Sequence, residues 1–252
     1  MRYPIRRTLL AACLTIASVA LATKTVSVED HSSKRIENNS AVVVAPAPAP
    51  APTAVNGSIE LYNELDLASN GMKSEVFELA LRGLNKLSDE GKITRQDKIT
   101  IVDFSQPSDQ KRLYVIDLVT KQILFHTLVS HGRGTGTLWA KSFSNQASSY
   151  KSSPGFYVTE ETYNGNNGYS LRLAGLERGI NDNARNRAIV MHGAPYANES
   201  TIGALGFLGR SQGCPALPLS IYKPVINTIK GGTCLFIYTP DESYLDHSEL
   251  LS

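Results

Sequence analysis

Two short motifs toward the C-terminal end of the sequence contain the residue types that nucleophilic catalysis needs. One is His192-Gly193, and the other is the Ser-Gln-Gly-Cys run at 211–214, which a loop separates from the first. A cysteine thiolate attacks carbonyl carbon atoms, and a neighbouring imidazole can take up the thiol proton. We therefore predict that Cys214 is a nucleophile, that His192 is its base, and that the rest of the chain positions them.

A free cysteine ionises near pH ~8.5, so a nucleophile that works at neutral pH benefits from a lowered pKa. Two features are candidates for lowering the pKa of Cys214. One is the His192 ring, which would form a thiolate–imidazolium pair with the sulfur. The other is the positive end of a short helix that we predict to begin near Pro218. The apolar run at 188–191 predicts a strand that holds His192 rigidly at the edge of a cleft.

The turn before the sulfur supplies candidate hydrogen-bond donors for an oxyanion. We predict that the backbone N–H groups of Gly213 and Cys214 converge on it, with the Gln212 side chain as a third donor. Pro215 has no N–H, so the donors must come from the residues before it. Ser211 has two open roles, because it either orients the imidazole or bonds locally within the turn.

Substrate contacts are predicted at residues around the two motifs. Arg210 can pair with a carboxylate through two parallel hydrogen bonds. His131 stands in a His-Gly-Arg-Gly run at a predicted strand end, where a substrate contact and a structural role are both open. Trp139 and Tyr150 belong to a long polar loop, 132–154, of the kind that forms lids. The predicted substrate-binding set is Gly193, Arg210, Gln212, His131 and Tyr196.

The cysteine count limits disulfide and metal chemistry. Of the three cysteines, Cys13 lies in the N-terminal apolar segment, which leaves Cys214 and Cys234. A disulfide between these two is an alternative to a free nucleophile. Against it, Cys234 lies in the apolar run 233–238, which predicts a buried strand. One His and one Cys are too few ligands for zinc, so we expect neither a metal nor a cofactor.

The N-terminus is typical of a secretory signal. Three arginines precede an apolar run at 9–21 that is too short to span a bilayer, and Ala20-Leu21-Ala22 is a small-x-small cleavage site. A lipid-attachment site at Cys13 is the alternative, but the apolar run continues past that residue. Removal of residues 1–22 leaves 22 basic against 23 acidic side chains. The processed chain therefore lacks the excess of basic residues that is typical of nucleic-acid-binding proteins.

Composition divides the chain into five parts. Alternating Ala and Pro at 45–52 favour an extended spacer, and helical patterns give way to strand patterns near Lys98. The predicted organisation is a signal peptide at 1–22, an Ala/Pro-rich linker at 23–56, a helical segment at 57–97, a catalytic domain at 98–240 and a polar tail at 241–252.

Hydrophobic periodicity predicts the elements of the folded part. Ser58 and Ser74 are expected to cap two helices, the second with apolar residues at helical spacing from Val76 to Leu87 and a stop at Gly91. Strands are expected at 99–104, 112–119, 122–130, 156–162, 169–173, 188–191 and 233–238, with two short helical pieces between 218 and 230.

Taken in order, these motifs resemble the catalytic domain of the murein L,D-transpeptidases. That family has His-Gly followed, after a loop, by Ser-His-Gly-Cys. The runs Ser130-His131-Gly132, 153–158 and Gly231-Gly232-Thr233 resemble three further family turns, so the resemblance covers about 98–240. Two departures stand out: Gln212 replaces the usual His, and Pro215-Ala216 replaces an apolar–Arg pair. Without that Arg, Arg210 or Arg133 is left to bind the substrate carboxylate.

The resemblance implies a mainly β fold, a mixed β-sandwich or partly closed barrel with an N-terminal helical segment and short helices. It implies attack by Cys214 on the carbonyl after diaminopimelate in a peptidoglycan stem peptide, loss of D-Ala, and transfer of the acyl group to an amine. Water as acceptor would make the protein an L,D-carboxypeptidase. The implied location is the periplasm or another extracytoplasmic site, with stem peptides as partners and membrane contact only through the signal peptide.

Two other interpretations compete with this one. In papain-like peptidases the Cys precedes the His by a long stretch, whereas here the His precedes the Cys by 22 residues. A non-catalytic peptidoglycan-binding module is a rival of a different class. The presence of both His192 and Cys214 argues against such a module.

Overall fold

The computed structural model describes residues 56–252. The signal peptide predicted at 1–22, the lipid-site alternative at Cys13 and all but the last residue of the predicted linker therefore lie outside the described residues. Within 56–252, no helix combines the length and apolar character that crossing a membrane requires.

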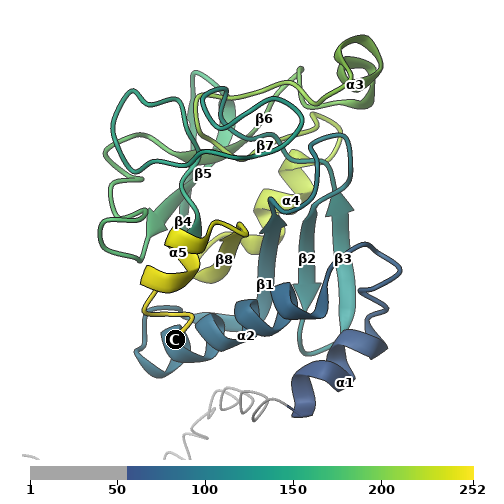
Figure 1. Cartoon of the computed structure of the whole chain (residues 1–252), viewed down its shortest axis with the longest axis vertical. Coiled ribbons are helices and arrows are strands. Elements are labelled where there is room, and N and C mark those ends of the chain that lie inside the picture. The colour runs from purple at the N-terminus through teal and green to yellow at the C-terminus, as the bar shows by residue number, and fades with distance from the viewer. Residues whose placement is uncertain (1–55) are drawn as a thin grey trace, which may run out of the picture. The chain divides into compact units, whose positions relative to one another are not determined.

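An eight-stranded mixed sheet is the framework of the described chain (Figure 1). Its strand order is β3-β2-β1-β8-β4-β5-β6-β7, and the pairs β1–β8 and β6–β7 are parallel, while the others are antiparallel. The strands are β1 (Arg95–Asp103), β2 (Leu113–Asp117), β3 (Gln122–Thr127), β4 (Gly155–Gly165), β5 (Gly168–Gly175), β6 (Val190–Gly193), β7 (Ala216–Leu217) and β8 (Thr233–Tyr238).

The two edges of this sheet meet, so it is nearly closed. The chain leaves edge strand β3 and forms an isolated bridge between Ser130 and Ala216 of the other edge strand, β7. A second bridge joins Gly132 to Ser211, where the Ser211 N–H donates to the His131 carbonyl at 2.9 Å. The expected mainly β, partly closed fold is thereby confirmed. The seam of the closure runs beside the predicted nucleophile.

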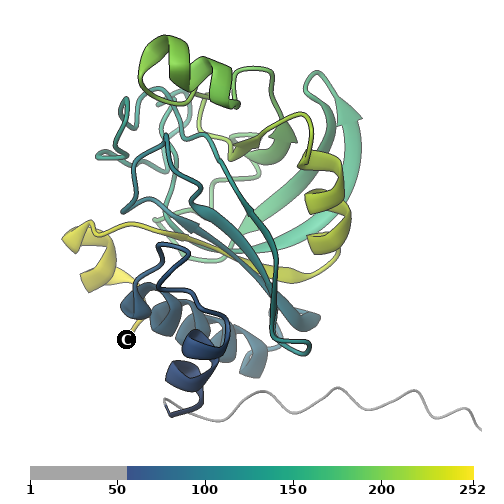
Figure 2. The same ribbon diagram turned by 90° about the vertical axis from the view of Figure 1, so that its right-hand side faces the viewer.

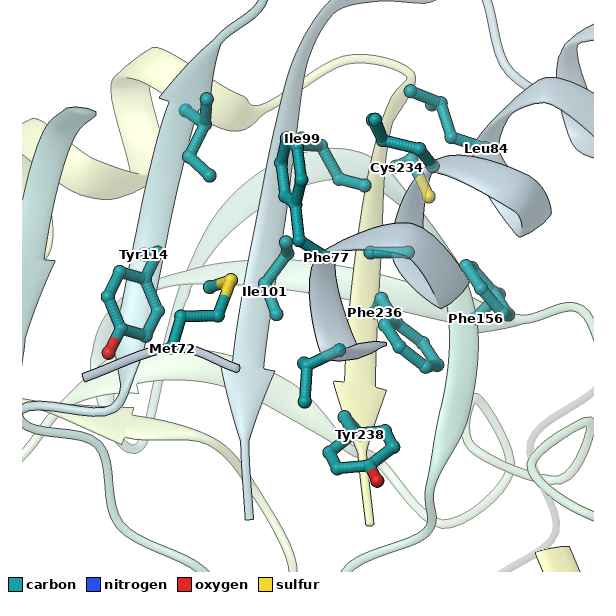
Figure 3. Packing of buried hydrophobic residues seen from close by; sticks show 14 of the residues in the cluster. Met72, Phe77, Leu84, Ile99, Ile101, Tyr114, Phe156, Cys234, Phe236 and Tyr238 are labelled. Atoms are coloured by element: carbon teal, nitrogen blue, oxygen red, sulfur yellow. The ribbon is translucent and has the colours of Figure 1, made fainter. Parts of the chain in front are cut away.

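Two helices cover one face of the sheet: α1 (Asn56–Glu64) and α2 (Ser74–Asp89). The apolar stripe of α2 is buried as predicted, and Figure 3 shows Phe77 and Leu84 directed at side chains of β1 and β8. The caps differ from the prediction. Ser74 is the first helical residue and Lys73 the N-cap, with no side-chain cap bond. Gly91 follows α2 with φ +64°, as its role of helix stop requires.

A second core lies on the other side of the sheet and includes helix α4 (Tyr222–Ile229). Val225, Ile226 and Ile229 of this helix are buried. The two helical pieces predicted between 218 and 230 are therefore one helix, preceded by a turn in which Ile221 and Tyr222 N–H groups donate to the Pro218 carbonyl. Pro224 lies in the first turn of α4, where its missing N–H costs little.

Two further helices were not anticipated. Helix α3 (Glu199–Leu205) interrupts the loop between the two motifs and lies at the opposite end of the molecule from α1 and α2 (Figures 1 and 2). Asn198 caps it by accepting from the Thr201 N–H at 2.8 Å. Helix α5 (Glu242–His247) lies in the segment expected to be a polar tail. That segment instead buries Tyr244, Leu250 and Leu251 in the core shared with α2.

Candidate active site

Strands β6 and β7 place the two predicted catalytic residues on one cleft. They pair in parallel with His192 opposite Ala216, so Cys214, two residues before Ala216, lies beside the start of β6. His192 and the partly buried Cys214 both line a cleft of about 640 Å³. The Cys214 Sγ atom lies 3.7 Å from the Ala188 carbonyl oxygen. The pairing of β6 with β7 thus brings together two residues that the sequence separates.

His192 is held by its own neighbour. Its Nδ1 atom lies 2.9 Å from the Gly193 carbonyl oxygen, which can only accept a hydrogen bond. Nδ1 therefore carries the proton, and Nε2 is the basic nitrogen of the neutral ring. Burial lowers the pKa of His192, while the bond to the Gly193 backbone acts in the opposite direction. The ring is consequently a neutral base at pH 7.

The sulfur is also favoured in its neutral form. Burial raises the pKa of Cys214, and a hydrogen bond with the Val190 backbone and the charge of Arg187 offset that rise only in part. The directions of these two pKa shifts oppose the predicted resting thiolate–imidazolium pair. The helix expected near Pro218 begins as a turn there and becomes α4 at Tyr222, and its effect on the pKa of Cys214 stays a prediction.

The turn that carries Cys214 is held by Ser211. Its Oγ atom donates to the Cys214 carbonyl at 2.7 Å and accepts from the Gly213 N–H at 3.0 Å. Of the two roles left open for Ser211, the structure shows the bond within the turn. The Gly213 N–H is thus engaged, whereas no described residue accepts the Cys214 N–H. One of the two predicted backbone donors therefore remains free for an oxyanion.

Gly213 is required by its conformation and by its surroundings. Its φ is +123°, a value that residues with a side chain rarely adopt. A Cβ at this position would lie 2.8 Å from the Lys151 carbonyl oxygen. The turn therefore packs directly against the backbone of the 132–154 loop, and that loop forms the next wall of the cleft.

The predicted substrate-binding residues divide into two groups. Arg210, Gln212 and Tyr196 line the cleft with Cys214. Gly193 does not line it: the residue is buried, and a Cβ there would meet the Tyr222 ring at 2.7 Å. Of the two loop aromatics, Tyr150 lines the cleft and Trp139 does not.

His131 is part of a buried support and does not face the cleft. Its side chain is fully buried, and its Nδ1 accepts from the Arg112 guanidinium at 2.8 Å. Burial, followed by the charge of Arg112, lowers the pKa of His131 to about 4. The backbone carbonyl of His131 accepts a hydrogen bond from the Ser211 N–H. Of the two roles left open for His131, the geometry supports the structural one, behind the nucleophile turn.

Both remaining cysteines are free thiols. Cys234 is fully buried in β8, within the core that contacts α2 (Figure 3). The alternative of a Cys214–Cys234 disulfide is therefore contradicted. In the part of the chain that the structure covers, no cluster of His, Cys, Asp and Glu is suited to hold a metal ion.

The cleft contains residues that the sequence did not single out. Arg187, just before β6, donates to four oxygen atoms of the 132–154 loop: the Ser144 and Lys151 carbonyls and the Ser149 and Ser153 hydroxyls. Asn166 and Asn167 reach the rim from the β4–β5 turn. No local motif marks these residues, because only the folded sheet brings them to Cys214.

Backbone strain is concentrated on the same cleft. Ser148, Tyr150 and Ala188 line it with φ values of +57°, +55° and +54°. A residue with a side chain pays about 1 kcal/mol or more for this left-handed conformation, which is often found at functional sites. Folding thus holds three cleft residues in a geometry that an isolated peptide would avoid.

Comparison with known proteins places the chain in a family. It belongs to the family described as the L,D-transpeptidase catalytic domain, whose model matches residues 68–238. This confirms the family suggested by the sequence motifs. No curated protein matches the chain.

Several solved structures are similar to part of the chain. An L,D-transpeptidase from Mycobacterium smegmatis is 12% identical, with 57% of this chain and 59% of that one covered and a TM-score of 0.36. An L,D-transpeptidase from Mycobacterium tuberculosis is 16% identical, with coverage of 57% and 58% and a TM-score of 0.36. One from Stackebrandtia nassauensis is 15% identical, with coverage of 71% and 75% and a TM-score of 0.35. The chain thus spans less than two thirds of the first two.

Proposed function

We propose that the protein is a cysteine-dependent L,D-transpeptidase that acts on peptidoglycan stem peptides. Membership in the catalytic-domain family supports this reaction class. The observation that carries the proposal is the common cleft of Cys214 and His192, with the Nε2 atom of His192 as the basic nitrogen. Action on the cell wall implies export, for which the sequence at 1–22 predicts the signal.

The proposed first half-reaction forms a thioester. His192 Nε2 takes the proton of the Cys214 thiol as the sulfur attacks the carbonyl carbon of diaminopimelate. The Cys214 N–H, with the exposed Gln212 side chain nearby on the rim, stabilises the negative oxygen of the tetrahedral intermediate. The bond to D-Ala then breaks, and the imidazolium gives its proton to the departing amine.

The second half-reaction releases the acyl group. An amine of another stem peptide attacks the thioester carbon, and His192 takes one of its protons. The new amide forms as the sulfur departs, and the imidazolium returns its proton to the sulfur. The directions of both pKa shifts favour a neutral thiol and a neutral base, so in this scheme each half-reaction starts and ends without a separated charge pair.

The test uses the purified protein with a tetrapeptide stem, with and without an amine acceptor. We expect D-Ala release, an acyl adduct on Cys214 seen by mass spectrometry, and a cross-linked product when the amine is present. The substitution Cys214→Ala should abolish all three. His192→Gln should slow turnover by about 10²–10⁴-fold, the usual contribution of acid–base catalysis.

Cys234 offers the matched control, because it is the other thiol of the described chain and is buried away from the cleft. Cys234→Ala should keep turnover and the adduct. D-Ala release without a cross-linked product would instead favour the carboxypeptidase. A folded protein that releases no D-Ala and carries no adduct would overturn the proposal in favour of a binding module.

A further inference from the structure

The cleft around Cys214 has an unbalanced charge. Arg133, Arg187 and Arg210 line it, and no Asp or Glu does. Across residues 56–252, none of these three arginines takes part in an ion pair with a carboxylate. A concave site with several cations and no acid attracts an anionic ligand. The cleft is therefore suited to a substrate that carries a carboxylate.

The three arginines differ in how far their donors are already used. Arg187 donates to four oxygen atoms of the 132–154 loop, so it is committed to the structure. Arg210 donates to the Gly136 carbonyl at 3.0 Å, and its guanidinium lies 5.1 Å from the Phe207 ring centre. The Arg133 guanidinium donates to no acceptor in the described part of the chain. All its donors are therefore available to a ligand, whereas Arg210 already makes one such bond and Arg187 makes four.

Arg133 is nevertheless held in place. Its guanidinium carbon lies 3.9 Å from the centre of the Tyr150 ring, which is the distance of a cation–π contact. Its backbone N–H donates to the Ser211 carbonyl at 2.8 Å, three residues from the nucleophile. Tyr150 is fixed in turn, since its carbonyl accepts from the Gly134 N–H at 2.9 Å. Stacking occupies one face of the guanidinium and leaves its donor edge open.

We infer that Arg133, stacked on Tyr150, binds a substrate carboxylate in the cleft of Cys214 and thereby sets the specificity for acidic stem peptides. This inference rests on the proposed function. A planar guanidinium can make two parallel hydrogen bonds to a carboxylate, which requires the open edge that Arg133 has. Two such groups lie next to the bond that is broken: the carboxylate of the terminal D-Ala and the side-chain carboxylate of diaminopimelate.

The test measures equilibrium binding to a Cys214→Ala protein, which cannot turn over. Three tetrapeptide stems are compared by calorimetry: the free acid, the same stem amidated at the terminal D-Ala, and the same stem amidated at diaminopimelate. We expect one amidation to weaken binding by about tenfold or more, the usual effect of removing a charged hydrogen-bond partner. The amidation that weakens binding identifies the bound carboxylate. When Arg133→Gln is added to the Cys214→Ala protein, the free-acid stem and the stem amidated at that carboxylate should bind equally.

Arg172 provides a matched control. Its guanidinium also stacks on a tyrosine, Tyr163, at 4.3 Å, but it does not line the cleft. Arg172→Gln should leave the preference intact. The inference is overturned if Arg133→Gln keeps the preference, if Arg210→Gln removes it instead, or if neither amidation matters. Binding needs no turnover, so the two proposals can fail separately. If the protein with Cys214 intact releases no D-Ala while the binding preference still depends on Arg133, only the proposed function is contradicted.

Discussion

The sulfur of Cys214 lies where its charged form is disfavoured. Burial raises the pKa of the thiol, and Arg187 is the cation that opposes this rise. A Cβ on the neighbouring Gly213 would lie 3.3 Å from the Arg187 guanidinium, which shows how close the cation is to the nucleophile turn. The same guanidinium holds the 132–154 loop. One residue therefore links the electrostatics of the sulfur to the wall of the cleft.

Removing this cation should make the thiol harder to ionise. A raised pKa means that the thiolate appears only at higher pH, so alkylation of Cys214 should have its midpoint above the ordinary value for a thiol. Arg187→Gln should move that midpoint further up, because only burial and the Val190 contact then remain. The measurement is the rate of iodoacetamide labelling against pH in a Cys234→Ala background, where Cys214 is the only thiol of residues 56–252.

Arg187→Lys separates charge from loop structure. Lysine keeps the positive charge but has no planar fork with which to reach four acceptors. The charge explanation requires a midpoint near that of the parent protein. Equal shifts of the labelling midpoint in the Gln and Lys variants would assign the effect to the loop. An unchanged midpoint in the Gln variant would show that Arg187 does not lower the pKa of Cys214.

At the scale of elements, helix α2 approaches the sheet so closely that one position must be glycine. Gly83 faces the ring of Phe156 on β4, which is stacked on Phe236 of β8 with ring centres 4.1 Å apart. A Cβ on Gly83 would lie 2.0 Å from the Phe156 ring. Neither ring can move freely, since both are fully buried (Figure 3). The helix and the sheet are thus locked at one distance.

Gly83→Ala should therefore destabilise the protein. Alanine favours a helix over glycine by about 1 kcal/mol, but overpacking a core typically costs ~1–3 kcal/mol and here forces two stacked rings apart. Gly203 in α3 is the control, because a Cβ there meets nothing within 4 Å. Gly203→Ala should leave stability unchanged or raise it. Urea unfolding measures both, and equal midpoints for the two variants would contradict the packing argument.

At the scale of the whole molecule, the C-terminal segment 241–252 seals the core under the sheet. The buried Glu177 carboxylate accepts from the Phe156 N–H at 2.7 Å, from the Tyr244 hydroxyl at 3.2 Å and from the Ser248 hydroxyl. Arg82 of α2 donates to the Leu251 carbonyl at 2.7 Å. Residues 241–252 thus connect α2 to Phe156 of β4 through Glu177, and the segment is part of the fold.

A pair of identical substitutions tests this role. Leu251 is 5% exposed and Leu219 is 55% exposed. Leu251→Ala should lower the free energy of unfolding by about 2 kcal/mol or more, as expected for a buried leucine. Leu219→Ala should change it by no more than about 0.5 kcal/mol. Chemical denaturation gives both values, and a Leu251 variant as stable as the Leu219 variant would show that the segment is a dispensable tail.

Features that depend on near neighbours were predictable from the sequence. The α2 stripe and seven of the eight strands follow from apolar spacing, and Ser211, His192 and Cys214 stand out by their types and motifs. Helix α3 and the burial of 241–252 were missed, since these segments are short and contain few apolar residues. The site residues Arg187, Asn166 and Asn167 were missed because their positions carry no local pattern.

The sequence by itself determined the chemistry available to this protein, a thiol and an imidazole on two glycine-containing turns, and the family to which it belongs. The tertiary structure decided which atoms face one another. Closing the sheet between Ser130 and Ala216 of β7 places His131 behind the nucleophile turn, and the folded sheet sets three arginines in the cleft of Cys214. The physical reason is that residue type is a local property, whereas burial, charge environment and donor direction depend on segments that meet only when the sheet closes.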